Sequence, residues 1–116
     1  MLTPRKTRVR KPSTKFRLTS QISTTISVTL LSRILATGET KSNTIRTALS
    51  TYAHKHKQIQ AVKVPDEFRA PIDFTQRAEI RAVLNPPSLL VEYERHAQHL
   101  GINTSELILR CLCLHL

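Results

Sequence analysis

Glycine occurs only twice in the 116 residues of this chain, and both copies stand at the same place in a repeated pattern. Gly38 opens "GETKSNTIRTAL" and Gly101 opens "GINTSELILRCL", so small polar residues and then an apolar, helix-like run follow each glycine. A shift of 63 positions superimposes the two glycines and three further pairs: Ser42 on Ser105, Ile45 on Ile108 and Leu49 on Leu112. Glycine adopts the left-handed conformation without steric cost. Each glycine is therefore predicted to end one helix shortly before another begins.

A run of alternating apolar and polar residues precedes each pair of helices. In "FRLTSQI" the alternation predicts a short, half-buried strand over 16–22, and "RAEIRAVL" predicts a second strand over 77–84. Between the first strand and Gly38, "STTISVTLLSRILATG" has apolar residues at helical spacing and predicts an amphipathic helix. An alternative interpretation places the first strand in "TISVTLL", which also alternates, but it leaves only about six residues of helix before Gly38.

Charge divides the chain into two unlike halves. Residues 1–63 hold 13 lysines and arginines against one acid, Glu39, whereas residues 64–116 hold five arginines against seven acids. Residues 1–15 contain six of the basic residues, two prolines and almost no large apolar side chain, which predicts a disordered basic arm. Such an excess of positive charge favours a polyanionic partner, with nucleic acid first and an anionic membrane surface second.

Several functional classes are disfavoured by what the sequence lacks. It shows no nucleophile, base and orienting acid at a recognisable spacing and no phosphate-binding glycine loop, so neither enzymatic activity nor a cofactor is expected. No apolar run approaches the roughly 18 residues of a membrane span, and no signal peptide is recognisable. A soluble, cytoplasmic protein is expected.

The cysteines and histidines are interpreted as packing or solvated residues. Cys111 and Cys113 would point about 200° apart on a helix, and no second cluster completes a four-ligand zinc site, so both are predicted to be small apolar packing residues. Neither histidine pair is expected to bind a metal: His54 with His56, in "HKHKQ" at a solvated helix end, and His96 with His99 near Gly101.

The order of strand, helix, glycine turn and helix resembles the ribbon-helix-helix fold of the Arc and MetJ repressor superfamily. Residues 16–56 show this order of elements once, and residues 77–116 show it again. In that family two copies pair, so that their strands form an antiparallel ribbon above four helices. One chain with both copies is similar to the tandem arrangement of TraY-like conjugation proteins. The resemblance implies a mainly α, α+β fold: an intramolecular pseudo-dimer whose copies are joined by a linker over 57–76.

The resemblance also implies which residues contact DNA. The ribbon face that points away from the helices would read base edges in the major groove, with Arg17, Thr19 and Gln21 from the first strand and Arg77, Glu79 and Arg81 from the second. Phosphate contacts are expected from the arm and from the N-termini of the second helices, through Arg5, Lys6, Arg8, Arg10, Lys11, Lys15, Lys41, Ser42, Thr104 and Ser105.

These features predict sequence-specific binding of double-stranded DNA, as a transcriptional repressor or an accessory factor of a mobile element. Two alternatives stay open. In one, the first half holds DNA and the acidic second half recruits a partner protein, as in an antitoxin-like or relaxosome-like adaptor. In the other, the basic arm drives non-specific coating of nucleic acid. The chain is expected to be a nucleoid-associated monomer that can self-associate on DNA.

Overall fold

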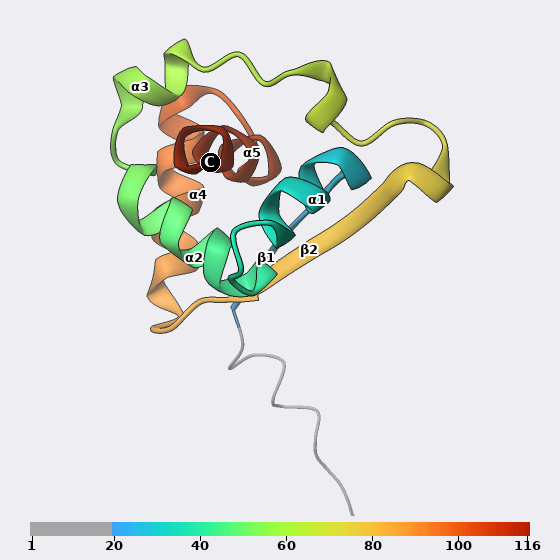
Figure 1. Cartoon of the computed structure of the whole chain (residues 1–116). Helices are drawn as coiled ribbons and strands as arrows, with labels where there is room; N and C mark the ends of the chain where they lie inside the picture. Colours follow the sequence, from blue (N-terminus) through green and yellow to red (C-terminus); the bar gives the residue numbers. More distant parts are fainter. Residues whose placement is uncertain (1–19) are drawn as a thin grey trace, which may run out of the picture.

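The structure is a computed structural model that describes residues 20–116. Over this range the chain forms a small α+β fold with two strands, five α-helices and two 3-10 helices. In chain order these are β1 (Gln21–Ser27), α1 (Val28–Leu35), α2 (Lys41–Tyr52), α3 (His56–Ala61), η3 (Asp66–Phe68), η4 (Phe74–Gln76), β2 (Arg77–Val83), α4 (Ser88–Leu100) and α5 (Thr104–His115). Figure 1 shows α2, α3, α4 and α5 gathered at one end of the two strands.

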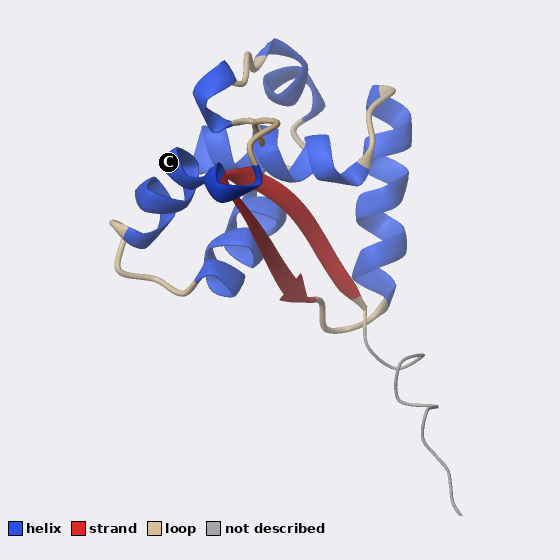
Figure 2. Cartoon of the chain, turned by 90° about the vertical axis from the view of Figure 1, so that its right-hand side faces the viewer, coloured by secondary structure: helices blue, strands red, loops and turns tan. Residues whose placement is uncertain are grey.

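The two strands form an antiparallel ribbon within the one chain. Gln21 lies opposite Val83, Thr24 opposite Ile80 and Ser27 opposite Arg77, and the strands run side by side in Figure 2. Successive side chains point to opposite faces of a strand. One face of the ribbon is accordingly buried in the core, through Ile22, Thr24, Ile26, Ile80 and Ala82. The second strand, predicted at 77–84, lies where the alternation places it.

The first strand lies later in the chain than predicted. The alternation in the sequence predicts it at 16–22, whereas β1 begins at Gln21 and ends at Ser27. Buried and exposed residues continue to alternate through Thr24 and Ile26, whose β-branched side chains favour strand backbone. Residues expected at the start of a helix therefore belong to the strand, and the predicted end of the strand at residue 22 is wrong. Residues 16–19 of the predicted strand lie outside the described residues.

Ser27 determines where the strand becomes a helix. Its Oγ accepts a hydrogen bond from the Leu30 amide at 3.2 Å, which caps the first turn of α1. The alternative interpretation, a strand through Val28 and Leu30, comes nearer to β1 but is wrong beyond this cap. Because the cap stands so late, α1 has only eight residues and ends at Leu35.

The two glycine turns share one backbone conformation. Gly38 has a φ of +83° and Gly101 a φ of +74°, values that residues with a Cβ rarely adopt. Two residues after each glycine, an N-cap side chain accepts a hydrogen bond from the amide three positions further on. Thr40 accepts from Asn43 at 3.1 Å, and Asn103 accepts from Glu106 at 2.8 Å. The repeat at 63 positions therefore extends to the turns and the helix caps.

A β-branched residue at either glycine is expected to destabilise the fold. An added Cβ would meet no atom within 4 Å at Gly38 or at Gly101, so the cost comes from the backbone alone and is on the order of 1–2 kcal/mol. Urea unfolding of Gly38→Val and Gly101→Val measures this loss. Asparagine tolerates the left-handed region better, so Gly38→Asn and Gly101→Asn serve as matched controls and should lose less. Valine variants as stable as the parent chain would contradict the expectation.

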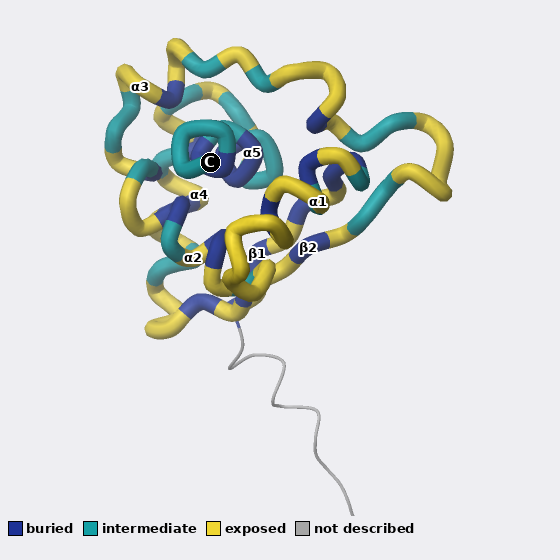
Figure 3. Tube along the Cα trace, viewed as in Figure 1, coloured by how far each residue is buried: buried dark blue, intermediate teal, exposed yellow. Residues whose placement is uncertain are grey.

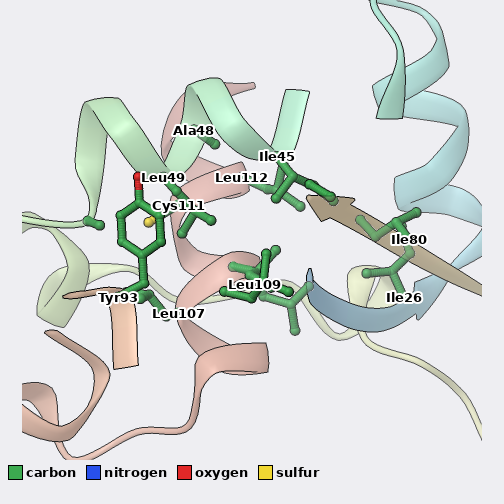
Figure 4. Packing of buried hydrophobic residues seen from close by; sticks show 14 of the residues in the cluster. Ile26, Ile45, Ala48, Leu49, Ile80, Tyr93, Leu107, Leu109, Cys111 and Leu112 are labelled. Atoms are coloured by element: carbon green, nitrogen blue, oxygen red, sulfur yellow. The ribbon is translucent and has the colours of Figure 1, made fainter. Parts of the chain in front are cut away.

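The second helix of each half packs on the strand of the other half. α2 packs against α5 and β2, and α5 packs against α2 and β1. Their inward residues again repeat at 63 positions, and all are at most 1% exposed: Ile45, Leu49, Ile108 and Leu112. Figure 4 shows this core between the helices and the strands, and Figure 3 shows how the buried positions line the inner sides of the elements. The two halves therefore share one core.

Residues 57–76, predicted as a linker, are attached to the core at two positions, whereas residues 72–76 are all exposed. Ile59 of α3 and Phe68 of η3 are buried in the core. Beyond Phe68, Arg69 forms an isolated bridge with Ile26 of β1. The Arg69 guanidinium also makes a two-pronged ion pair with Glu106 of α5, with N to O distances of 2.7 and 2.9 Å. The segment thus joins α5 to the edge of the ribbon.

Candidate nucleic-acid interface

The outer face of the ribbon is exposed and largely polar. Its residues alternate with the buried ones, so their positions follow directly from the register of the strands. Three register pairs make up its exposed part: Gln21 with Val83, Ser23 with Arg81, and Thr25 with Glu79. This set of residues is called the ribbon face below. It presents amide, hydroxyl, carboxylate and guanidinium groups next to one another on two adjacent strands.

Four of the six residues predicted to read bases lie in the described ribbon. Gln21, Glu79 and Arg81 are on the ribbon face, and Arg77 is at its end opposite Ser27, half-buried. Arg17 and Thr19 lie outside the described residues. Ser23 and Thr25 face outward beside Gln21 because β1 extends to Ser27, and the predicted strand bounds had missed them. The alternation of Ile22, Thr24 and Ile26 was the signal that could have found them.

The charged groups of the ribbon are paired in two different ways. Arg81 Nη2 lies 2.7 Å from Glu79 Oε1, in an ion pair whose side chains are both more than half exposed. Arg77 places its guanidinium 4.5 Å from the centre of the Phe74 ring and donates from Nε to the Pro71 carbonyl. The first pair stays within reach of a ligand on the ribbon face. Arg77 is instead held against the segment that precedes β2.

Two serines fasten the N-termini of the second helices to the ribbon. Ser42 Oγ of α2 donates to the Arg81 carbonyl at 2.9 Å, and Ser105 Oγ of α5 donates to the Ser23 carbonyl at 3.4 Å. Ser23 and Arg81 are partners in the strand register. Each serine therefore bonds to the strand of the opposite half, at the same level of the ribbon. Both hydroxyls, predicted to bind phosphate, have a partner inside the protein.

The first turns of α2 and α5 differ in charge. Lys41 is exposed at the first position of α2, which has no acid in its first turn. Thr104 holds the same position in α5, but there Glu106 follows within the turn. The hydrogen bond from Arg69, with a further one from Arg110, lowers the pKa of Glu106 below its usual value. A helix N-terminus attracts anions through its free N–H groups. At the α2 end Lys41 adds positive charge, and the Glu39 carboxylate accepts a hydrogen bond from Asn43 Nδ2 in the first turn.

Arg46 is a further cation beside the ribbon face that the sequence did not reveal. It lies on α2, and its Nη1 donates to the Val83 carbonyl at 3.3 Å, at the end of the ribbon where Gln21 pairs with Val83. Only the packing of α2 on β2 brings it there. The remaining phosphate contacts predicted for the arm, Arg5, Lys6, Arg8, Arg10, Lys11 and Lys15, lie outside the described residues.

The cysteines lie in or beside the core. Cys111 is fully buried, and this burial raises the pKa of its thiol to about 12, so the thiol is neutral at physiological pH. Cys113 is half-buried, and burial also raises its pKa. Residues 20–116 contain no group of three or more His, Cys, Asp or Glu side chains arranged to hold a metal ion. In the same range, every helix is too short or too polar to cross a membrane.

No known protein family, curated protein or solved structure shows a significant match to this chain.

Proposed function

We propose that this protein binds double-stranded DNA in a sequence-specific manner, with the β1–β2 ribbon in the major groove. The observation that supports this most is the exposed polar ribbon face on a two-stranded sheet whose other face is committed to the core. The major groove of B-DNA admits a two-stranded ribbon and presents a distinct donor and acceptor pattern for each base pair. A narrow ribbon with exposed polar side chains on one face suits that groove.

The side chains of the ribbon face match the groups that bases present. Gln21 can bond to adenine through both atoms of its amide, Arg81 suits guanine, and Glu79 can accept from the amino group of cytosine. The ion pair between Glu79 and Arg81 fixes the two groups relative to each other. Ser23 and Thr25 add hydroxyls that bond to several bases. In this proposal the ribbon reads a short run of adjacent base pairs.

The helix N-termini would position the ribbon by contacting phosphates. Ser42 and Ser105 hold α2 and α5 against the ribbon at one register pair, so the two N-termini would face the two DNA backbones on either side of the groove. Lys41 and Arg46 add positive charge on the α2 side. At α5 the Glu106 carboxylate is already ion-paired with Arg69 and Arg110.

We further propose that the two halves form a tandem ribbon-helix-helix unit with pseudo-twofold symmetry. The crosswise packing of α2 and α5, the paired serine contacts and the repeated turns support it. The symmetry is broken before the first glycine. α1 has eight residues and follows β1 directly, whereas α4 has 13 residues and starts after a connection at 84–87. An asymmetric ribbon of this kind would read a non-palindromic site, as a repressor or an accessory factor of a mobile element.

An adaptor is the second candidate function, and the division of charge favours it. Residues 64–116 have two more acids than basic residues, whereas residues 1–63 have 13 basic residues and one acid. In this reading the first half would hold DNA and α4, whose Val91 is 52% exposed, would recruit a protein. A third possibility, non-specific coating, is separable by experiment, because it follows charge alone and weakens steeply with salt.

Replacing Gln21 by alanine is expected to weaken binding to the cognate site by about 1–3 kcal/mol while leaving binding to random DNA nearly unchanged. The lost group would be a base contact, and random DNA offers no matching base. The cognate site is first selected from genomic fragments in the presence of competitor DNA, and affinities are then measured by fluorescence anisotropy. Gln98→Ala, an exposed glutamine on α4, is the matched control. Equal losses on both DNAs would exclude base reading by Gln21, and failure to select any site would exclude the proposed function.

A further inference from the structure

Three histidines from two helices meet where α3 packs against α4. His56 Nε2 lies 2.7 Å from His96 Nδ1. The His56 ring also stacks on the His99 ring, with centroids 4.5 Å apart and 29° between the planes. His56 is the first residue of α3, and His96 and His99 are one turn apart on α4. The cluster therefore joins the segment between the two halves to the second half.

This contact restricts how many protons the cluster can hold. A hydrogen bond between two imidazole nitrogens requires a proton on one of them and a lone pair on the other. The facing nitrogens of His56 and His96 therefore cannot both be protonated while the contact persists. Burial, followed by the nearby His99, His96 and His54, lowers the pKa of His56 below its ordinary value. The contact is therefore compatible with one proton between the two facing nitrogens and not with two.

The other charged groups around the cluster are mostly basic. Arg95 and Glu92 of α4 line the same cavity of about 700 Å³ as the three histidines. Lys55 caps α3, and Lys57 is the second residue of that helix. From α5, Arg110 Nη1 reaches the Ile59 carbonyl of α3 at 3.4 Å. Arg110 is already ion-paired with Glu106 of α5 at 3.0 Å. Glu92 is therefore the one carboxylate among the cavity-lining residues that faces added protons.

We propose that His56, His96 and His99 form a proton-operated latch. It holds α3 against α4 while the facing nitrogens of His56 and His96 share one proton, and it releases α3 when both nitrogens are protonated. Protons on both facing nitrogens remove the hydrogen bond, and two or three like charges at contact distance then repel each other. Ile59 anchors α3 in the core and α2 packs directly on α5. Release is therefore local, and it frees the α3–α4 contact while the packing of α2 on α5 persists.

The direction of the pH dependence follows from the lowered pKa of His56. The open state binds protons more tightly than the closed state, so acid favours opening. The closed latch is fully stable above the ordinary histidine pKa of 6.5, and its stability falls as the pH drops through the lowered value in the closed state. Opening is accordingly expected in the range below about pH 6.5.

Amide hydrogen exchange at pH 7.5 and pH 5.5, with a chelator present, tests the latch. After correction for the intrinsic exchange rates, the protection of α3 and of the half of α4 that contains His96 should fall at pH 5.5. At pH 5.5, one pH unit below the ordinary histidine pKa of 6.5, the lowered pKa of His56 can reduce this protection by at most about tenfold. The protection of α2 and α5 in the same sample is the internal reference and should change much less.

Two variants keep the proposal falsifiable. In His56→Gln the side chain can still donate and accept a hydrogen bond, but it does not titrate. The ratio of α3 protection at pH 7.5 to that at pH 5.5 should therefore approach the same ratio for α2, even if α3 is less protected at both pH values. His115→Gln, outside the cluster, should keep the full pH effect of the parent. The proposal is overturned by equal α3 protection at both pH values, by a pH effect that survives in His56→Gln, or by chelator-dependent protection at pH 7.5, which would assign the cluster to a metal.

Discussion

Replacing Ile45 or Ile108 by alanine is expected to lower the free energy of unfolding by about 2–5 kcal/mol in each case. Both side chains are at most 1% exposed, and they occupy corresponding positions in α2 and α5. Each substitution removes buried apolar surface and leaves a cavity in the core that the two halves share. Similar losses are expected because α2 and α5 pack on each other and on the opposite strands.

Urea unfolding of both variants measures these losses, and Val91→Ala is the matched control. Val91 is also a β-branched residue in a helix, but it is 52% exposed, so its truncation should cost far less. Losses similar to that of Val91→Ala would show that the shared core is not formed as described. A large loss for Ile108→Ala alone would show that the first half contributes little to it.

Deleting residues 1–13 is expected to reduce affinity for every DNA sequence and to make its salt dependence shallower. The deletion removes Arg5, Lys6, Arg8, Arg10 and Lys11. If all five contact phosphates, the slope of log affinity against log salt becomes less negative by about 4–5, since each contact contributes roughly 0.9. A protein whose phosphate contacts are concentrated in this segment would lose several orders of magnitude in affinity at low salt.

The measurement is a salt titration of binding to cognate and random duplexes. A full-length variant with the same five residues changed to glutamine controls for chain length, and it should behave like the deletion. An unchanged slope would show that these cations do not touch phosphate. A loss confined to the cognate site would assign the segment a base-reading role instead. Because Gln21 lies outside the deletion, the ratio between cognate and random affinity should survive in part.

The sequence predicted the second helices and their turns well because the signals for them are local. A glycine, a capping residue two positions later and apolar residues at helical spacing specify such a unit without reference to the rest of the chain. The residue pairs that the repeat aligns, Ile45 with Ile108 and Leu49 with Leu112, are all buried in the core. The position of the first strand was harder to predict, because apolar and polar residues alternate both from Phe16 and from Ile22. Ser27 as a helix cap was the local signal that separates them.

The features that the sequence could not predict depend on contacts between distant residues. Nothing local indicates that His56 would meet His96, or that Arg46 would reach the end of the ribbon. The burial of Ile59 and Phe68 also could not be predicted. In the sequence they are single apolar residues within a polar segment, and only the folded structure shows that they pack in the core. On the ribbon, the alternation placed Glu79 and Arg81 outward, but their pairing with Thr25 and Ser23 followed from the register of two strands far apart in sequence.

The crosswise packing of the strands and second helices has a consequence for synthesis of the protein on the ribosome. The β2 partners of β1 lie far later in the chain, from Arg77 opposite Ser27 to Val83 opposite Gln21. α5 supplies much of the surface that covers β1. Until β2 and α5 have left the exit tunnel, Ile22 and Ile26 lack their cover and β1 has an unpaired backbone edge. Such edges invite pairing with other chains. The nascent first half therefore passes through a period in which neighbouring nascent chains on one polysome compete with β2 for the same strand.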